Sequence, residues 1–134
     1  MTGKSTFGPY SASREGGGLV FTSGQIGVDP TTKSAASDIA GQAEQALRNL
    51  AAVLADAGLE MSDVVKTTVF LTDMGDFATM NDVYLKHFPT APRPARSCVA
   101  VAELPRVANM PLRFEIEAVA DINLAEARSL SDLP

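Results

Sequence analysis

The sequence predicts an α+β domain with one mixed sheet and two helices packed on one face. Two segments, 39–57 and 76–88, repeat apolar residues at spacings of three and four, as helices with a single apolar stripe do. The segments 8–26, 64–71 and 96–119 contain β-prone runs, several of which alternate with a period of two. Because strands precede and follow each helix, a single sheet is the simplest architecture, with its other face left to water or a second subunit.

Length and composition favour one folded domain and exclude several function classes. The chain has 134 residues, 46% hydrophobic and 20% charged, as is typical of globular domains. Its net charge of -5 disfavours nucleic acid as a partner, since phosphate contacts need clustered Lys and Arg. One Cys and one His make a zinc site improbable, and no disulfide can close within the chain. With no long apolar run and no signal-peptide pattern, we expect a cytoplasmic protein without a membrane segment.

The first part of the chain is typical of a hairpin followed by a long helix. A strand from Gly8 to Arg14, a turn at residues 16–18 and a return strand over 19–26 form the hairpin. Ser23, Gly24 and Gln25 interrupt the return strand, and a Gly there often marks a bulge or a close approach of the backbone to another group. Any strand near residue 33 is short. The first helix starts at residue 37 or 38, which can cap it, and ends at Gly58.

The second part supplies a central strand, a shorter helix and two more strands. Residues 64–71, VVKTTVFL, are β-branched enough for a central strand, and residues 76–88 form the second helix. Pro89, Pro92 and Pro94 end that helix and extend the chain toward Arg96. We expect a single domain over residues 1–120. Residues 121–134 are polar and are expected to form a loosely held C-terminal tail.

Two strands near the end carry the candidate chemistry. Alternation places Ser97, Val99 and Val101 on one face of the first strand, and residues 114, 116 and 118 on one face of the second. If these apolar sets face the core, Arg96 and Cys98 point away from it, together with Glu115 and Glu117. The uncovered face of the sheet would then carry a guanidinium and two carboxylates.

These charged residues have both a functional and a structural interpretation. The fork of Arg96 suits a carboxylate ligand, although an ion pair with either glutamate explains it equally well. Glu115 and Glu117 share a face, so that their repulsion could raise one pKa and keep a proton available for transfer, or both could simply be solvated. Cys98 lacks an adjacent base, and we interpret it as a small inert residue. Tyr10 could anchor the hairpin, and Ser23 could satisfy a bulged backbone.

Seven short motifs, taken in order, resemble the Rid family of enamine/imine deaminases, also called the YjgF family. They are GPY at residues 8–10, FTSGQI at 21–26, NLAAVLADAGLE at 49–60, VVKTTVFLTDM at 64–74, the pair Tyr84 and Phe88, RPARSCVAV at 93–101, and FEIEAVA at 114–120. The resemblance covers nearly everything from residue 8 to residue 120.

The resemblance implies a chorismate-mutase-like fold, a homotrimer whose open sheet faces line the inside, and sites between subunits. It implies hydrolysis of 2-aminoacrylate and its imine tautomers to 2-keto acids and ammonia, with no cofactor. By position, Arg96 would bind the substrate carboxylate and Glu115 would position or activate water. Tyr10, Ser23 and Phe88 would line the pocket, and Cys98 would contribute mainly through its backbone.

Two alternatives remain open at the level of the sequence. The trimer could bind small carboxylates such as 2-keto acids without turning them over, as a regulatory module. A deaminase of altered specificity is also possible, because the loop over residues 106–114 is longer than is usual in the family and adds Arg106 and Arg113 near the expected site. Ribonuclease activity, which has been ascribed to some members, fits poorly with the acidic composition.

Overall fold

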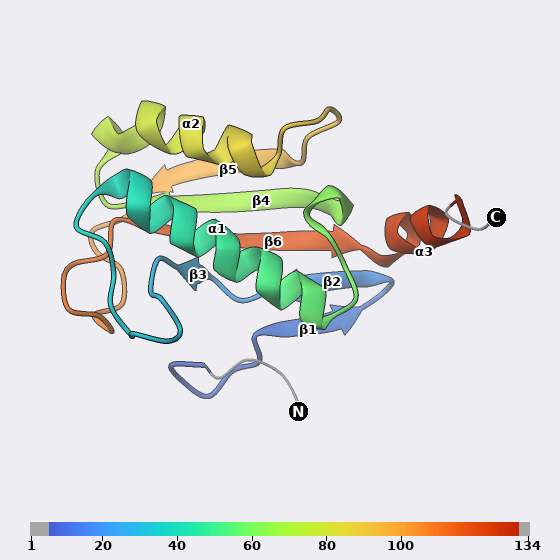
Figure 1. Cartoon of the computed structure of the whole chain (residues 1–134), viewed down its shortest axis with the longest axis horizontal. Coiled ribbons are helices and arrows are strands. Elements are labelled where there is room, and N and C mark those ends of the chain that lie inside the picture. The colour runs from blue at the N-terminus through green and yellow to red at the C-terminus, as the bar shows by residue number, and fades with distance from the viewer. Residues whose placement is uncertain (1–5, 132–134) are drawn as a thin grey trace.

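The chain folds as one mixed sheet with helices on one face, as the sequence predicts. The computed structural model describes residues 6–131. The strands are β1 (Ser13–Gly16), β2 (Leu19–Thr22), β3 (Gln25–Ile26), β4 (Val64–Leu71), β5 (Ala95–Ala100) and β6 (Phe114–Asp121). Their order is β1-β2-β6-β4-β5, with β3 also paired to β6 (Figure 1). β4 and β5 are parallel, whereas the other pairs are antiparallel.

Helices α1 (Ile39–Asp56) and α2 (Phe77–His87) lie side by side on the same face of the sheet (Figure 1). α1 begins after Asp38 and is followed by Gly58, whose φ of 78° is one that glycine adopts without strain. Two short 3-10 turns, η1 (Met61–Asp63) and η2 (Met74–Asp76), flank β4. The apolar stripes of both helices pack on β4 and β6 and form the main core, whose fully buried side chains include Leu47, Leu50, Leu54, Val69, Leu71, Met80, Phe114 and Ile116.

The N-terminal hairpin agrees with the prediction and ends in a break. Gly17 and Gly18 have φ values of 62° and 79°, so the turn uses backbone conformations that other residues adopt at a cost. The hairpin strand β1 begins at Ser13 rather than near Gly8. After β2 the chain leaves the sheet at Ser23 and Gly24 and rejoins it as β3 beside β6. Around residue 33 there is no more than an isolated bridge between Val28 and Ala35.

The expected tail contains a third helix, α3 (Ile122–Ser131). Arg128 on this helix forms ion pairs with Asp63, which is buried, and with Glu60. Ile122 and Ala125 pack against the main core. The sequence suggested a loose tail because of its polar residues, but two apolar positions and one arginine are enough to attach a short helix. The division into residues 1–120 and 121–134 stays a prediction, and its outermost residues, 1–5 and 132–134, lie outside the described part.

The predicted faces of β5 are wrong. Val99 is 43% exposed, whereas Cys98 packs against the main core. Arg96 is paired across the sheet with Thr67, which is fully buried under the helices, so Arg96 and Cys98 face α2. Alternation divides a strand into two faces but does not say which face meets the core. In this edge strand Val99 lies on the side away from the helices.

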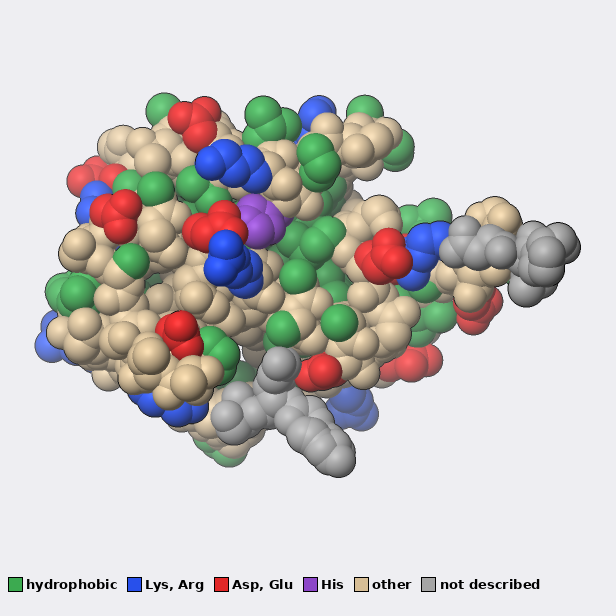
Figure 2. Space-filling model, in the orientation of Figure 1, with side chains coloured by type: hydrophobic (Ala, Val, Ile, Leu, Met, Phe, Trp, Pro, Cys, Tyr) green, Lys and Arg blue, Asp and Glu red, His purple; other side chains and the backbone are tan. Residues whose placement is uncertain are grey.

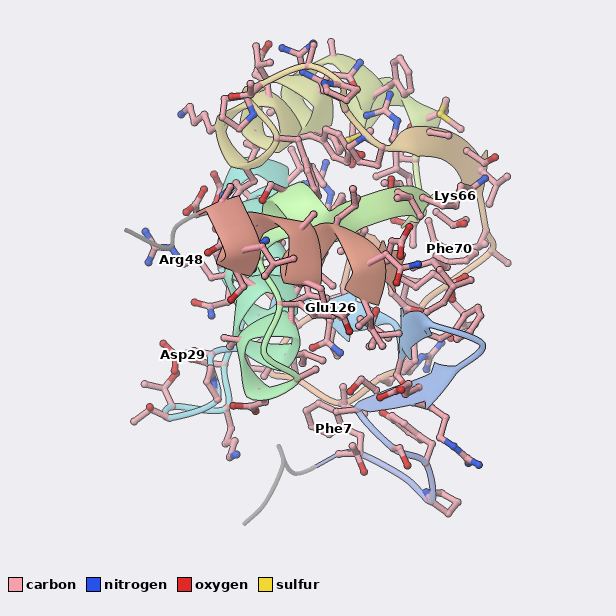
Figure 3. All side chains as sticks on the ribbon, turned by 90° about the vertical axis from the view of Figure 1, so that its right-hand side faces the viewer. Phe7, Asp29, Arg48, Lys66, Phe70 and Glu126 are labelled. Atoms are coloured by element: carbon pink, nitrogen blue, oxygen red, sulfur yellow. The ribbon has the colours of Figure 1, made fainter. Side chains whose placement is uncertain are left out.

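The predicted faces of β6 are confirmed. Phe114, Ile116 and Ala118 are buried under the helices, and Glu115 and Glu117 lie on the open face. Glu115 is paired across the sheet with Phe70 of β4. Figure 3 shows Phe70 and Lys66 directed away from the helices, on the side of the sheet opposite to Arg48 of α1. None of the helices within residues 6–131 is long and apolar enough to span a bilayer.

Candidate functional site

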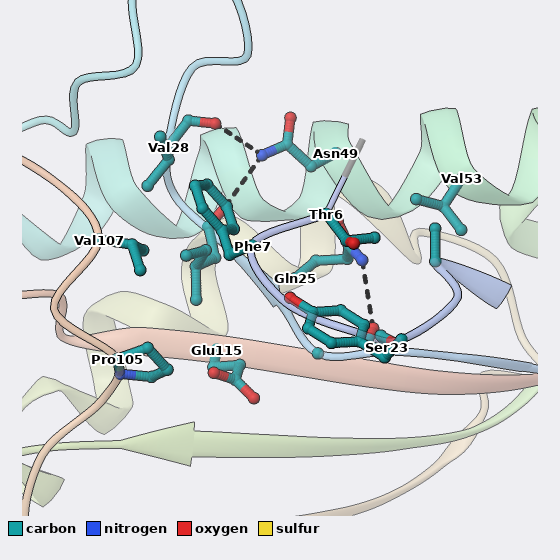
Figure 4. A pocket seen from close by; sticks show the side chains of 14 residues that line it. Thr6, Phe7, Ser23, Gln25, Val28, Asn49, Val53, Pro105, Val107 and Glu115 are labelled. Carbon is teal, nitrogen blue, oxygen red and sulfur yellow. Dashed lines mark hydrogen bonds between the residues drawn. The ribbon is translucent and has the colours of Figure 1, made fainter. Parts of the chain in front are cut away.

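Glu115 lies in a cavity of about 360 Å³ between the N-terminal segment, β3, α1 and the loop that precedes β6 (Figure 4). In addition to Glu115, the cavity is lined by two other residues that the sequence singled out, Tyr10 and Ser23. Its remaining lining is Thr6, Phe7, Ala12, Gly24, Gln25, Ile26, Val28, Asn49, Val53, Pro105 and Val107. The structure thus brings three predicted site residues from distant parts of the chain to one place.

The break between β2 and β3 makes room for the Glu115 carboxyl group. A Cβ atom on Gly24 would lie 2.1 Å from Glu115 Oε2 and 2.7 Å from its Cδ. Only a residue without a side chain lets the carboxyl group lie this close to the backbone, which is the close approach that the sequence suggested. The position of Glu115 therefore depends on Gly24.

Burial raises the pKa of the Glu115 carboxyl group, and the neighbouring Glu117 raises it further. The sequence predicted the repulsion between the two glutamates, but the loss of solvation is the larger cause. A carboxyl group with a raised pKa keeps its proton to higher pH, which suits a group that both accepts and returns protons.

Several polar side chains around the cavity are engaged with the chain's own backbone. Ser23 Oγ donates to the carbonyl oxygen of Ser11 at 2.6 Å. Asn49 Nδ2 donates to the carbonyl oxygens of Ile26 and Val28, both at 2.9 Å (Figure 4). These bonds fix the segment on either side of β3. In the sequence, Asn49 enters only as the first residue of the motif at 49–60, because a lone Asn on a helix is usually a solvated residue.

Arg96 lies on the other face of the sheet, against α2. Its guanidinium carbon is 4.7 Å from the centre of the Tyr84 ring and 5.5 Å from that of Phe77. Nη1 also approaches Met80 Sδ at 3.8 Å. Stacking on aromatic rings holds the cation without neutralising it, so the half-buried guanidinium keeps its charge for an anion.

Phe88 and Cys98 lie behind or beside Arg96 rather than in the Glu115 cavity. Phe88 is 4% exposed and stacks on Tyr84, with ring centres 4.7 Å apart, so it supports the ring on which Arg96 rests. Burial raises the pKa of the half-buried Cys98 thiol, and Arg96 partly offsets that rise. β5 is the edge strand of the sheet, so one side of the backbone around Cys98 pairs with no other strand of the described residues.

One feature of α2 near Arg96 had no signal in the sequence. The side-chain oxygen Oδ1 of Asn81 is buried and has no hydrogen-bond partner among residues 6–131. Asn81 lies one helical turn after Phe77, whose ring contacts Arg96. A buried acceptor of this kind normally has a partner, and the described residues do not supply one.

The loop between β5 and β6 forms a small core of its own. Leu104 and Leu112 are buried with Ile26, Val28 and Ala35, and Phe70, Val101, Val107, Ala108 and Met110 pack around them. Gln42 of α1, fully buried, binds the backbone of Pro111 and Arg113. Of the two arginines that the loop adds, Arg113 binds Asp76 through two hydrogen bonds of 2.6 and 3.1 Å, and Arg106 pairs with Glu103 in solvent.

The two halves of the predicted site therefore do not meet within one chain. Thr67 and Phe70 are three residues apart on β4, point to opposite faces, and are paired with Arg96 and Glu115 respectively. A small molecule cannot contact both groups across the sheet. If Arg96 and Glu115 serve one site, they come from different subunits.

Comparisons with known proteins agree with the fold and the motifs. A family model described as Endoribonuclease L-PSP matches residues 3–122. A Salmonella typhimurium protein named 2-iminobutanoate/2-iminopropanoate deaminase is 49% identical, with 84% of this chain and 87% of that protein covered. The crystal structure of Escherichia coli TdcF with bound serine has a TM-score of 0.81 and 44% identity, over 89% of this chain and 92% of the other. The structure of RidA from the Antarctic bacterium Psychrobacter sp. has a TM-score of 0.82 and 38% identity, over 90% of this chain and 94% of the other.

Proposed function

The chain belongs to the Rid (YjgF) family, and from this premise we propose that it hydrolyses 2-aminoacrylate and related 2-imino acids to 2-keto acids and ammonia. The names of relatives at 46–49% identity, which are deaminases of 2-iminobutanoate and 2-iminopropanoate or of reactive intermediates, support the reaction class. The serine bound to TdcF supports a site for a small molecule with a carboxylate.

The reaction needs little beyond positioning and proton transfer. The C=N carbon of an imine is already electrophilic, so water can add to it once the substrate is held. In our proposal the Arg96 guanidinium binds the substrate carboxylate through its two-pronged fork. Glu115 takes a proton from the attacking water as the new C–O bond forms and passes it to the imine nitrogen, which gives a carbinolamine. It then transfers the hydroxyl proton to the amino nitrogen, so that the C–N bond breaks, the C=O bond of the keto acid forms and ammonia leaves. The raised pKa of Glu115 supports this double role.

The active assembly that we propose is a homotrimer with each site between two subunits. The observation that carries this proposal is the placement of Arg96 and Glu115 on opposite faces of one sheet. The exposed edge strand β5 would bring Arg96 of one subunit to the open sheet face of the next, where Glu115 lies. The apolar side chains on that uncovered side, Phe21 at 46% and Val99 at 43% exposure, support an interface there.

A coupled assay tests the activity. An enzyme that generates 2-aminoacrylate is mixed with the protein, and pyruvate formation is timed against buffer. We expect acceleration, and we expect Arg96→Ala to abolish it while the melting temperature stays within a few degrees. If the protein binds 2-ketobutyrate but does not accelerate pyruvate formation, it is a receptor for small carboxylates instead.

The charge distribution supports a small-molecule substrate rather than RNA, despite the description of the family model. The net charge is -5, and acidic and basic side chains are interspersed over the face that carries α1 and α2 (Figure 2). RNA binding favours a continuous basic surface. We propose the cytoplasm as the site of action, where amino-acid metabolism would produce such imines.

A further inference from the structure

The cavity beside Glu115 is much larger than a 2-aminoacrylate molecule requires. Its volume is about 360 Å³. A methyl group, the side chain of the imine that 2-aminoacrylate forms, fills roughly the 30 Å³ that one water molecule occupies in the liquid. Pockets for small ligands ordinarily measure about 300–1,000 Å³ and enclose most of the surface of the ligand.

Apolar side chains form much of the wall of this cavity. Phe7, Ile26, Val28, Val53 and Val107 contribute hydrocarbon surface from four separate segments of the chain. Figure 4 shows Phe7 opposite Glu115, with Val107 and Pro105 on one side and Val53 on the other. Ile26, Val28 and Val53 are less than 9% exposed, so this part of the wall is rigidly packed.

Apart from Glu115 and Tyr10, the polar side chains of the wall donate their hydrogen bonds to the chain itself. Thr6 Oγ1 donates to the carbonyl oxygen of Gly8, and Gln25 Nε2 donates to that of Ser23. Ser23 and Asn49 likewise donate to backbone carbonyl oxygens. Donors used in this way hold the wall together, and a polar substrate side chain would lose its hydration without gaining their bonds.

We infer that this cavity receives an apolar substrate side chain larger than methyl, either branched aliphatic or aromatic. The inference rests on the proposed function and adds the substrate class. With the reacting carbon beside Glu115 and the carboxylate held by the arginine of a neighbouring subunit, the side chain points toward Phe7 and Val107. Val107 and Pro105 belong to the loop between β5 and β6, which makes that loop a determinant of specificity.

The test compares imines that differ only in side chain. An amino-acid oxidase generates the imines of alanine, leucine and phenylalanine, and their loss is followed by trapping the remaining imine. Each methylene group buried in an apolar cavity raises kcat/KM by about fourfold. Because the cavity is partly open, we expect kcat/KM for the leucine imine to exceed that for the alanine imine by about tenfold, well below the full value for three carbons.

Variants connect the preference to this cavity. Val107→Phe fills it from the loop, and we expect the leucine-to-alanine ratio to fall toward one. The side chain of Phe7, which is 55% exposed, forms one wall of the cavity. Phe7→Ala removes this wall, so the leucine-to-alanine ratio of kcat/KM should also fall. It serves as the second variant if Val107→Phe does not fold. Leu130→Phe on α3, at 68% exposure and away from the cavity, is the matched control and should leave the ratio unchanged.

The outcomes separate this inference from the proposed function. Hydrolysis of the alanine imine as fast as, or faster than, the larger imines overturns the inference and leaves the deaminase proposal intact. If no imine is hydrolysed faster than in buffer, the deaminase proposal fails, and calorimetry with pyruvate and 4-methyl-2-oxopentanoate then decides the cavity's preference. Tighter binding of the larger keto acid, lost in Val107→Phe, supports the inference, whereas equal binding contradicts it.

Discussion

Replacing Gly24 by alanine tests whether the carboxyl group of Glu115 works where the structure places it. The added Cβ would lie 2.1 Å from Glu115 Oε2, and Cβ contacts below 3.0 Å are essentially never found. The carboxyl group therefore has to retreat by roughly 1 Å, because the backbone of Gly24 is held by the strands on both sides. The carboxyl group ends a flexible side chain, so it moves while the fold remains.

A displacement of about 1 Å in a catalytic group costs on the order of a hundredfold in rate. We expect Gly24→Ala to lower kcat/KM for imine hydrolysis by that factor. Its free energy of unfolding, from urea titration, should change by less than about 1 kcal/mol, because Gly24 does not have a positive φ.

Gly16→Ala is the matched control, since a Cβ at Gly16 meets no atom within 4 Å. This variant should keep full activity. If Gly24→Ala is as active as the original protein, the carboxyl group next to Gly24 does not take part in the reaction, and the assignment of Glu115 is refuted.

Three further predictions concern charged groups. Arg96→Lys keeps the charge but loses the fork and the stacking, so KM should rise at least tenfold, measured by steady-state kinetics. Glu115→Gln removes a carboxyl group whose charged form is disfavoured in the fold. The gain in stability of this variant over the original protein should therefore be absent below about pH 4 and should grow as the pH rises through the raised pKa of Glu115. Asp76→Ala leaves Arg113 without its two-pronged partner and should cost about 1–3 kcal/mol in urea unfolding.

For each of these three predictions, one outcome would contradict the physical reason given. An unchanged KM in Arg96→Lys would exclude two-pronged carboxylate binding. A stability difference for Glu115→Gln that is independent of pH would mean that burial does not disfavour the charged carboxyl. For the ion pair, Glu103→Ala breaks the exposed pair with Arg106 and should change stability by less than about 0.5 kcal/mol. An equally small effect of Asp76→Ala would show that its pair does not hold the loop.

The sequence predicts the elements of this fold well because their signals are local. The two helices and β4 can be recognised from their own residue patterns, without knowing which elements pack against them. The turn at residues 17–18 can be recognised because glycine adopts positive φ values without strain. The face of β5 could not be predicted in this way. Arg96 faces the helices, where α2 presents the rings of Tyr84 and Phe77 at that edge of the sheet. This contact depends on the tertiary structure and cannot be read from the residues of β5 alone.

For the candidate site, too, the local motifs were informative and the contacts between distant parts of the chain were not predictable. The motifs point to Glu115, Tyr10 and Ser23, and the structure brings these three residues to one cavity. The sequence suggested that the loop affects specificity through Arg106 and Arg113, but the loop residues that line the cavity are Pro105 and Val107. The position of the loop could not be foreseen, because it depends on partners about 70 positions away, as in the bonds between Gln42 and the backbone of Pro111 and Arg113. α3 was missed since its attachment depends on Arg128 reaching Asp63, a residue 65 positions earlier.

The most direct test of a site shared between subunits is a complementation experiment. Arg96→Ala and Glu115→Gln, each expected to be inactive, are unfolded together, refolded as a mixture and assayed, with each variant refolded alone as a control. In a random 1:1 trimer, about a quarter of the interfaces combine an intact Arg96 with an intact Glu115 from the neighbouring chain, so about a quarter of the original activity should return. Native mass spectrometry confirms that mixed trimers form. Mixed trimers that remain as inactive as their parents would contradict the account.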